Sequence, residues 1–304
     1  MSQTPKIGLV TVLYNAQEVL EGFFDSLAKQ TYENFTLYMI DNSPDDLSAK
    51  EAKRQMARYP RIDVRFVKNE INNGNTGGDN QGIAMALEEG ADYVMLINND
   101  TEFAEDTITL MVELAESKEA PIVTPKIYIH GTEKIWVAGG YFSYLKGTTP
   151  HYGEGEEDRG QYDRHMILDY APSCVMLIAR RVFEDIGVID NNYFIYYDDT
   201  DFIYRAKKRG HHIHFCYRTR IWHKVSHSTG GEVSDLFVFY VMRNRIYFIN
   251  KNYPFPYRQI ALLYTSLSAI AKYIRFTPSQ RKALVKAYKE GWQMSHQLEV
   301  EESV

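Results

Sequence analysis

The stretch Tyr93-Val-Met-Leu-Ile-Asn-Asn-Asp-Thr101 decides the fold of this chain. Its first five residues are mostly apolar and run directly into polar turn formers, which predicts a strand buried on both faces of a parallel sheet. Ligands of open α/β sheets bind beyond the carboxyl ends of the strands. Asp100 is therefore expected at such an end, where a carboxylate flanked by two carboxamides can hold Mg²⁺ or Mn²⁺. The alternative is a simple capping turn, because Asn and Asp favour such positions in any case.

Strands and helices alternate on both sides of this stretch. Strands are expected at residues 7–14, 35–40, 62–67, 121–128, 173–179 and 212–216. Helices are expected at residues 16–30 (with Asn15 as N-cap), 47–59, 106–117, 180–187, 234–250, 257–276 and 278–297. The rhythm of strand, helix and strand predicts an α/β fold with a mostly parallel, doubly wound sheet, followed by a C-terminal helical region after a boundary near residue 230.

Length and composition exclude several classes of protein. The chain has 304 residues, which suits one large α/β domain or one domain with an appended subdomain. A formal charge of −6 argues against a surface that coats nucleic acid. The two cysteines form no CxxC pair, and the sequence shows neither a signal peptide nor a bilayer-spanning apolar run. These features predict a cytoplasmic protein.

A run rich in Asn and Gly, residues 72–82, leads into a helix expected at 83–89. Glycines let backbone N–H groups approach phosphate oxygens, and a helix N-terminus adds a favourable dipole. The spacing matches neither GxxxxGK[ST] nor GxGxxG, and the first strand-to-helix turn has no glycine, so triphosphate-loop and nicotinamide interpretations are disfavoured. The run is expected to be a ligand-binding loop, with a long flexible connection as the alternative.

Three carboxylates, Asp198, Asp199 and Asp201, crowd into four residues ahead of a helix expected at 202–209. Plain capping would explain them, because acidic residues are common at helix N-termini. The aromatic residues before them would raise a carboxylate pKa and suit a general base, so catalysis is the competing interpretation. His223, beyond the last expected strand, is a candidate metal ligand or phosphate donor.

Two further regions complete the pattern. Trp136 is expected near the site, and residues 141–163, rich in Gly, Tyr and charge, predict a mobile flap. Residues 243–245, Arg-Asn-Arg, supply positive charge. The apolar segment 260–274 is expected to pack on the core, to form a dimer face or to lie on a membrane surface.

In this order the motifs resemble those of glycosyltransferase family 2, the inverting transferases with the GT-A fold. The resemblance is closest to the bacterial rhamnosyltransferase and galactofuranosyltransferase branch and covers about residues 6–250. It is carried by residues 11–15, 40–43, 72–82, 98–100, 172–187 with Asp190, 196–201 and 222–223. One departure is that the DXD position reads Asn98-Asn99-Asp100, with a single carboxylate.

The resemblance implies a role for each matching position. Asp41 would accept a hydrogen bond from a pyrimidine base, Asp100 and His223 would hold the metal, and Asp199 would be the catalytic base, with Asp198 as the alternative. Asp201 would orient its neighbours at the substrate. The remaining substrate-binding positions would be Thr11, Tyr14, Asn15, Asn72, Gly74, Gly77, Gly78, Asn80 and Asn98. Residues 1–230 would form the catalytic domain, with a nucleotide-sugar half at about 1–125 and an acceptor half at about 126–230, and residues 231–304 would form the helical region.

The implied reaction is transfer of rhamnose from dTDP-rhamnose to a saccharide or lipid-linked saccharide in bacterial surface polysaccharide synthesis, with Mg²⁺ or Mn²⁺. The first alternative is a galactofuranosyl- or other hexosyltransferase using a UDP-sugar. A nucleotidyltransferase and a non-catalytic sugar-binding subunit are more distant alternatives. The expected partners are the nucleotide-sugar donor and the acceptor but not nucleic acid. Peripheral contact with the inner face of the cell membrane and a homodimer through the C-terminal helices complete the expectations.

Overall fold

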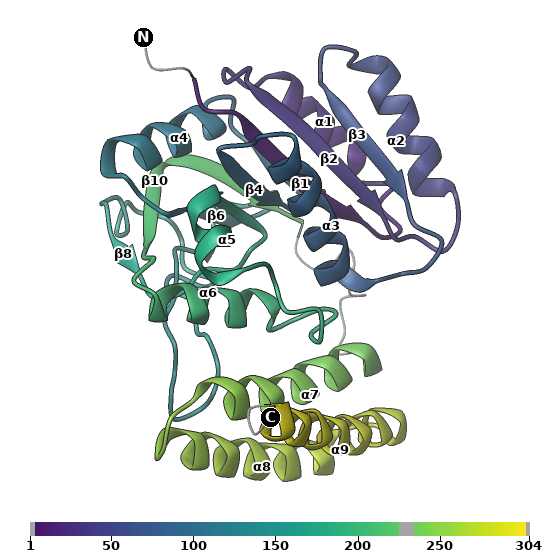
Figure 1. Ribbon diagram of the computed structural model, residues 1–304, viewed down its shortest axis with the longest axis vertical. Coiled ribbons are helices and arrows are strands. Elements are labelled where there is room, and N and C mark those ends of the chain that lie inside the picture. The colour runs from purple at the N-terminus through teal and green to yellow at the C-terminus, as the bar shows by residue number, and fades with distance from the viewer. Residues whose placement is uncertain (1–3, 225–233, 302–304) are drawn as a thin grey trace.

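The computed structural model describes residues 4–224 and 234–301, with side chains described as far as residue 295, and shows one large sheet flanked by helices (Figure 1). The strands are β1 (Ile7–Leu13), β2 (Phe35–Asp41), β3 (Val64–Lys68), β4 (Tyr93–Ile97), β5 (Thr101–Phe103), β6 (Ile122–Ile129), β7 (Ile135–Val137), β8 (Ile167–Leu168), β9 (Val175–Ala179) and β10 (Ile213–His223). The helices are α1 (Leu20–Ala28), α2 (Leu47–Arg58), α3 (Gly74–Glu88), α4 (Thr107–Lys118), α5 (Arg180–Ile186), α6 (Asp198–Lys208), α7 (Asp235–Asn252), α8 (Tyr257–Arg275) and α9 (Pro278–Glu301).

The sheet has the order β3-β2-β1-β4-β9-β6-β10-β5. The first four strands are parallel, as predicted, and β9 then runs antiparallel to both β4 and β6, so the second half is mixed. All five residues of β4 are buried between β1 and β9, which confirms the prediction for the stretch at 93–97. The expected α/β fold is therefore confirmed, and one sheet joins both halves of the site.

Helix α3 replaces the expected ligand-binding loop, because it begins at Gly74 and includes most of the Asn/Gly-rich run. A Cβ on Gly78 would lie 2.7 Å from a methyl group of Val12, and a Cβ on Gly82 would also lie under 3.0 Å from Val10. The glycines therefore let the helix pack closely on β1. Reading them as loop residues was wrong, because close helix–strand contact selects glycine as strongly as a turn does.

Other boundaries also differ from the predicted ones. Helix α1 begins at Leu20, so Asn15 is not its N-cap; Asn15 has a φ of 52° and donates its backbone N–H to Ser43 Oγ at 3.0 Å. Helix α6 begins at Asp198, four residues before the predicted start, so the acidic residues belong to its first turn. Strand β10 extends through His223, which places this residue in the sheet rather than beyond it.

The segment 141–163 is packed against the core and does not stand off as an open flap. Phe142 is buried, and its ring lies 5.2 Å from Tyr204 and 6.4 Å from Phe248. At the far end, Lys126 Nζ is 2.9 Å from Asp158 Oδ2. The segment has an irregular backbone, but aromatic packing and a buried ion pair hold it in place, so the predicted mobile flap was wrong.

The C-terminal helices form a layer beneath α6, with α7 between α6 and α8 (Figure 1). Helix α7 contributes Tyr247, Phe248 and Ile249 to the main core. Its other side joins α8 and α9 in a small cluster of Val238, Met242, Ile246, Ala269, Leu284 and Ala287. The boundary expected near residue 230 falls in 225–233, outside the described residues. Within the described chain, no helix has the length and apolar character to span a bilayer.

Candidate active site

The part of the site expected to bind the donor, called the donor side below, lies at the carboxyl ends of β1, β2 and β4. Asp41 ends β2, is fully buried, accepts a hydrogen bond from Ser43 N–H at 2.9 Å and lies 3.1 Å from Lys68 Nζ. Asn99 Nδ2 donates to Val12 O at 2.6 Å and so ties the turn after β4 to β1. The strand-end position predicted for these polar residues is confirmed, whereas the base-binding role of Asp41 stays a prediction.

Asp100 and His223 meet across the antiparallel pair of β5 and β10. Imidazole Nε2 of His223 lies 3.1 Å from Asp100 Oδ1, and both residues are buried. Apart from this contact, Asp100 Oδ1 has no hydrogen-bond partner among the described residues, and neither does the other ring nitrogen, His223 Nδ1. The ring of Trp136 lies 4.6 Å from that of His223, which confirms the expected position of this tryptophan.

A buried carboxylate oxygen without a hydrogen bond, next to an imidazole nitrogen, fits a divalent cation that also takes oxygens from a diphosphate. The described residues contain no group of three or more His, Cys, Asp or Glu side chains that could hold a metal by themselves. Two protein ligands would thus leave most of the coordination to the substrate and water, as Mg²⁺ commonly does.

The part of the site expected to face the acceptor, called the acceptor side below, is built on a strained turn before α6. Phe194, Tyr196 and Tyr197 have φ values of 67°, 64° and 64°, which bulky residues rarely adopt. Asn244 of α7 is fully buried, and its Nδ2 lies within hydrogen-bond distance of the carbonyl oxygens of Tyr193 (3.0 Å), Ile195 (2.8 Å) and Tyr196 (2.8 Å). Such strain persists only where surrounding contacts hold it.

This turn delivers Asp198 and Asp199 to the N-terminus of α6. Asp199 is half-buried, and its Oδ2 accepts hydrogen bonds from Tyr170 OH at 3.0 Å and Ser173 N–H at 3.3 Å, while its Oδ1 accepts from the N–H and hydroxyl of Thr200. Burial raises the pKa of Asp199, and these hydrogen bonds oppose the rise because they stabilise its anion.

Asp198 has a different environment. It is buried, and Thr76 Oγ1 donates to its Oδ2 over a long distance of 3.4 Å, while hydrogen bonding from Asn75 lowers its pKa slightly. Burial, followed by the charge of Asp199, raises the pKa of Asp198 to about 7. Burial thus raises the pKa of both neighbouring carboxylates, and the hydrogen bonds to Asp199 oppose its rise.

Asp79 of α3 is a third buried carboxylate in this group, and the sequence analysis missed it. Its Oδ2 accepts a hydrogen bond from Asn75 Nδ2 at 2.8 Å, and burial, followed by the charge of Asp198, raises its pKa well above the usual range. The missing signal was helical spacing: Asn75 and Asp79 are four residues apart, so they share one face of α3 once the run is recognised as a helix.

Residues Ser173 and Cys174, just before β9, join the two sides. Asn98 N–H donates to Cys174 O at 2.8 Å on the donor side, while Ser173 N–H faces Asp199 on the other. Burial raises the pKa of the Cys174 thiol well above its usual range, and the charges of Asp100 and Asp199 both add to the rise. The thiol thus lies within electrostatic reach of both carboxylates, which places the two sides of the site close together.

The remaining predicted positions divide by their surroundings. Thr11 is buried in β1 and its hydroxyl has no hydrogen-bond partner within residues 4–224 and 234–295, while Tyr14 is 45% exposed at the strand end. Asn72 Oδ1 accepts from Gly74 N–H at 2.8 Å, and Gly77 packs against Asn73. These contacts of Asn72, Gly74 and Gly77 shape the start of α3, and the substrate-binding roles of Thr11 and Tyr14 stay predictions.

Asn80 and Asp201 belong to the scaffold. Asn80 exchanges hydrogen bonds with the backbone of Ile189, donating at 2.7 Å and accepting at 3.0 Å. Asp201 is fully buried and accepts hydrogen bonds from Tyr193 OH (3.1 Å), Asn252 Nδ2 (2.8 Å) and Arg205 Nε (2.8 Å). Direct substrate binding by these two side chains does not fit their contacts, and an orienting role does.

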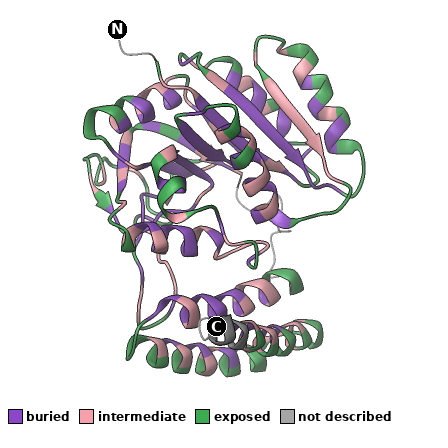
Figure 2. Ribbon diagram, viewed as in Figure 1, coloured by how far each residue is buried: buried purple, intermediate pink, exposed green. Residues whose placement is uncertain are grey.

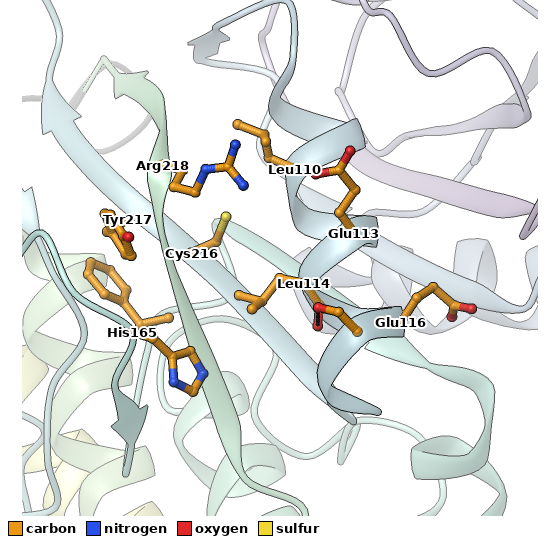
Figure 3. A pocket seen from close by; sticks show the side chains of 10 residues that line it. Leu110, Glu113, Leu114, Glu116, His165, Cys216, Tyr217 and Arg218 are labelled. Atoms are coloured by element: carbon orange, nitrogen blue, oxygen red, sulfur yellow. Dashed lines mark hydrogen bonds between the residues drawn. The ribbon is translucent and has the colours of Figure 1, made fainter.

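A hollow of about 660 Å³ lies elsewhere, between α4 and β10 (Figure 3). Leu110, Leu114, Cys216 and Arg218 line it, with His165 at one side, and it shares no residue with the acidic pair or the Asp100–His223 pair. These two pairs therefore lie outside this hollow, at the strand ends and at the N-terminus of α6.

The comparison with protein families decides the identity. The model described as "Glycosyl transferase family 2" matches residues 9–187, more than half of the chain. The chain belongs to glycosyltransferase family 2. The matched range includes the donor side of the site and Ser173–Cys174 and ends before the acidic pair.

Curated relatives of this family 2 enzyme are also glycosyltransferases. The chain is 25% identical over 269 residues to the low-salt glycan biosynthesis hexosyltransferase Agl10 of Haloferax volcanii, covering 87% of this chain and 81% of the relative. It is 24% identical over 249 residues to the N-acetylglucosaminyl-diphospho-decaprenol L-rhamnosyltransferase of Mycobacterium tuberculosis, covering 75% and 79%. The chain is thus a glycosyltransferase of glycan or polysaccharide synthesis.

Solved structures confirm the GT-A fold. S. aureus TarS 1-349 in complex with UDP-GlcNAc superposes with a TM-score of 0.61 at 14% identity, over 95% of this chain and 81% of that one. The mannosyltransferase PcManGT from Pyrobaculum calidifontis, in complex with GDP-Man and Mn²⁺, superposes with a TM-score of 0.56 at 13% identity, over 97% and 85%.

Proposed function

We propose that this enzyme transfers a sugar, with inversion, from a nucleoside-diphosphate donor to a hydroxyl group of a free or lipid-linked saccharide. The observation that best supports this proposal is the position of Ser173 and Cys174 between Asp100 and Asp199. Ser173 N–H lies within hydrogen-bond distance of Asp199, and Cys174 O accepts from the backbone of Asn98, two residues before Asp100. Inverting transfer requires such an arrangement, with charge neutralisation on the diphosphate side and a base on the acceptor side. Residues 1–125 would supply the first and residues 126–230 the second.

Asp199 is our candidate for the base. It is the more exposed carboxylate of the pair, and its hydrogen bonds from Tyr170, Ser173 and Thr200 favour the ionised form that a base needs. It would take the acceptor hydroxyl proton as that oxygen bonds to the anomeric carbon and the nucleoside diphosphate leaves with the electrons of the broken bond. Asp198, with its pKa of about 7, is the alternative.

Asp100 and His223 would hold Mg²⁺ or Mn²⁺, consistent with the close approach of Asp100 Oδ1 to His223 Nε2 and with the Mn²⁺ bound in PcManGT. Bound there, the cation would neutralise charge on the leaving diphosphate. Among the protein's own groups, Asp41, Thr11 and Tyr14 would contact the nucleotide, because they lie at the same strand ends.

For the donor we propose dTDP-rhamnose, supported by the name of the mycobacterial relative. A UDP-hexose is the second candidate, supported by the hexosyltransferase relative and by UDP-GlcNAc bound in TarS. Membership of family 2 sets aside the nucleotidyltransferase alternative.

The test incubates the full chain with Mn²⁺, each nucleotide sugar and a panel of saccharide acceptors, and measures nucleoside diphosphate release and the anomeric configuration of the product. Asp199→Asn should lose about 10²–10⁴-fold in kcat, as expected for a general base, while calorimetry shows unchanged donor binding. Retention of the donor's anomeric configuration, or wild-type turnover by Asp199→Asn, would overturn the mechanism.

A further inference from the structure

Helix α8 presents an exposed apolar face on the outer side of the C-terminal layer. The α8 stripe consists of Ile260 (43% exposed), Leu263 (62%), Leu267 (58%), Ile270 (61%) and Ile274 (71%). Intervals of three and four residues place these side chains in one line along the helix. Figure 2 shows exposed residues along the outer side of α8. A continuous stripe of this kind marks an interaction surface, whereas single exposed apolar residues need no explanation.

The inward side of the same helix is already used. Ala261, Thr265 and Ala269 are buried, and they alternate with the stripe around the helix. Small residues there let α8 approach α7 and α9 closely. The outward leucines and isoleucines therefore contribute nothing to this packing, and their exposure calls for an occupant outside the fold.

The charge around the stripe indicates which occupant. Helix α8 contains Arg258, Lys272 and Arg275 and has no Asp or Glu. Over residues 257–290, seven Lys and Arg residues face a single Glu, although the whole chain carries a formal charge of −6. Positive charge is thus concentrated in the helix that carries the α8 stripe and in the one that follows it, although the protein as a whole is acidic. That combination is characteristic of helices that lie on anionic membranes.

We propose that the α8 stripe docks on the surface of an anionic lipid bilayer, with the helix lying parallel to the membrane plane. Tyr257, Tyr264 and Tyr273 support this geometry. Each is between 42% and 44% exposed on α8, and tyrosine rings favour the headgroup level, where one end is apolar and the other is hydrated. Because α7 lies between α8 and α6 (Figure 1), docking through α8 would leave α6, the helix that carries the acidic pair, on the other side of α7 from the lipid.

A second copy of the chain fits the stripe less well. Both ends of α8 are basic, with Arg258 in the first turn and Lys272 and Arg275 in the last, so a pair of α8 helices in either direction would bring positive charges together. A single helix face also offers less surface than the roughly 800 Å² per partner of a standard stable interface. Anionic lipid removes both difficulties, because it supplies opposite charge and accepts a single helix.

Vesicle co-sedimentation of the full chain tests the proposal without using enzymatic activity. The protein should bind vesicles of phosphatidylcholine with phosphatidylglycerol, bind phosphatidylcholine alone much more weakly, and dissociate partly as salt is raised. The double variant Leu267→Glu, Ile270→Glu should bind the anionic vesicles at least about tenfold more weakly than wild type does. Leu47→Glu, a change at a side chain of similar exposure (51%) on α2, should bind like wild type.

The variants must keep the wild-type circular dichroism spectrum and melting temperature, as expected for exposed positions. Equal binding to neutral and anionic vesicles, no binding to either, or undiminished binding of the double variant would overturn the proposal. A concentration-dependent wild-type dimer that the double variant loses, together with no vesicle binding, would instead assign the stripe to a second copy. Loss of transferase activity in any variant does not bear on the result, so this test and that of the proposed reaction can fail separately.

Discussion

Replacing Asn244 with alanine should disable catalysis while leaving the protein folded. Its carboxamide lies below the turn that carries Asp198 and Asp199, within hydrogen-bond distance of three carbonyl oxygens. Arg243 Nε donates to Asn244 Oδ1 at 2.8 Å, which fixes the orientation of the amide so that its N–H groups face the turn. Removing the side chain deletes these contacts together.

The magnitude follows from the strain and from the lost hydrogen bonds. Each left-handed aromatic residue in the turn costs of order 1–3 kcal/mol, so Phe194, Tyr196 and Tyr197 store roughly 3–9 kcal/mol that the surroundings must hold. A buried carbonyl left without its donor costs about 1–3 kcal/mol. We expect the turn of Asn244→Ala to relax rather than bear both costs, with a net loss of about 2–4 kcal/mol in the free energy of unfolding. Displacing Asp199 by about 1 Å should lower kcat by about 10²-fold.

The assay combines urea unfolding with nucleoside diphosphate release, and Asn250→Ala is the matched control. Asn250 lies in the same helix and bonds Ile246 O at 3.1 Å and Ser295 Oγ at 3.0 Å, away from the turn. Its loss should cost about 0.5–1.5 kcal/mol with kcat unchanged. A folded Asn244→Ala protein with wild-type kcat, or equal losses of kcat in the two variants, would refute the reasoning.

Two further predictions concern stability. Burial, then the charge of Asp199, raises the pKa of Asp198 from 3.8 to about 7, so the folded state holds this proton more tightly than the unfolded chain and stability falls as pH rises from about 4 to about 7. Urea unfolding should therefore show that Asp198→Asn is on the order of 4 kcal/mol more stable than wild type near pH 8 and little changed near pH 4. An equal difference in the free energy of unfolding at both pH values would contradict this. Gly82→Ala should lower the free energy of unfolding by about 1–3 kcal/mol, because its Cβ would overlap Val10 in the core. The control Gly22→Ala would meet only the flexible end of the Glu102 side chain, so the free energy of unfolding should stay the same or rise by up to about 1 kcal/mol. Equal effects of the two variants in thermal melts would exclude the packing argument.

The sequence was sufficient for what depends on local pattern. The apolar run at 93–97 predicted β4, and the rule that ligands bind at carboxyl ends placed Asp41 and Asp100 at the ends of β2 and β4, on either side of β1. The position of Asp198 and Asp199 at a helix start was also correct, although the helix begins four residues earlier than expected.

The sequence was insufficient where two distant segments set the outcome. Asn244 contacts carbonyl groups 48 to 51 residues away, so no local pattern identified it, and the surrounding Arg residues suggested only positive charge. The glycines of α3 fit equally well in a loop or against a strand, and the positions of Val10 and Val12 in the folded protein decide between them. The left-handed turn at 194–197 was equally hidden, because aromatic residues rarely adopt that conformation.

The buried ammonium group of Lys126 limits how the segment 141–163 can be exchanged between relatives. Its side chain is 1% exposed, and it is paired with Asp158 and Asp163 at the end of this segment. A loop transplanted from another transferase to change acceptor preference would have to bring carboxylates at both positions. Without them, an uncompensated charge would remain in the core at a cost of about 3–5 kcal/mol. Lys126 therefore belongs to the same exchangeable unit as the loop, although it lies in β6, outside the loop's sequence.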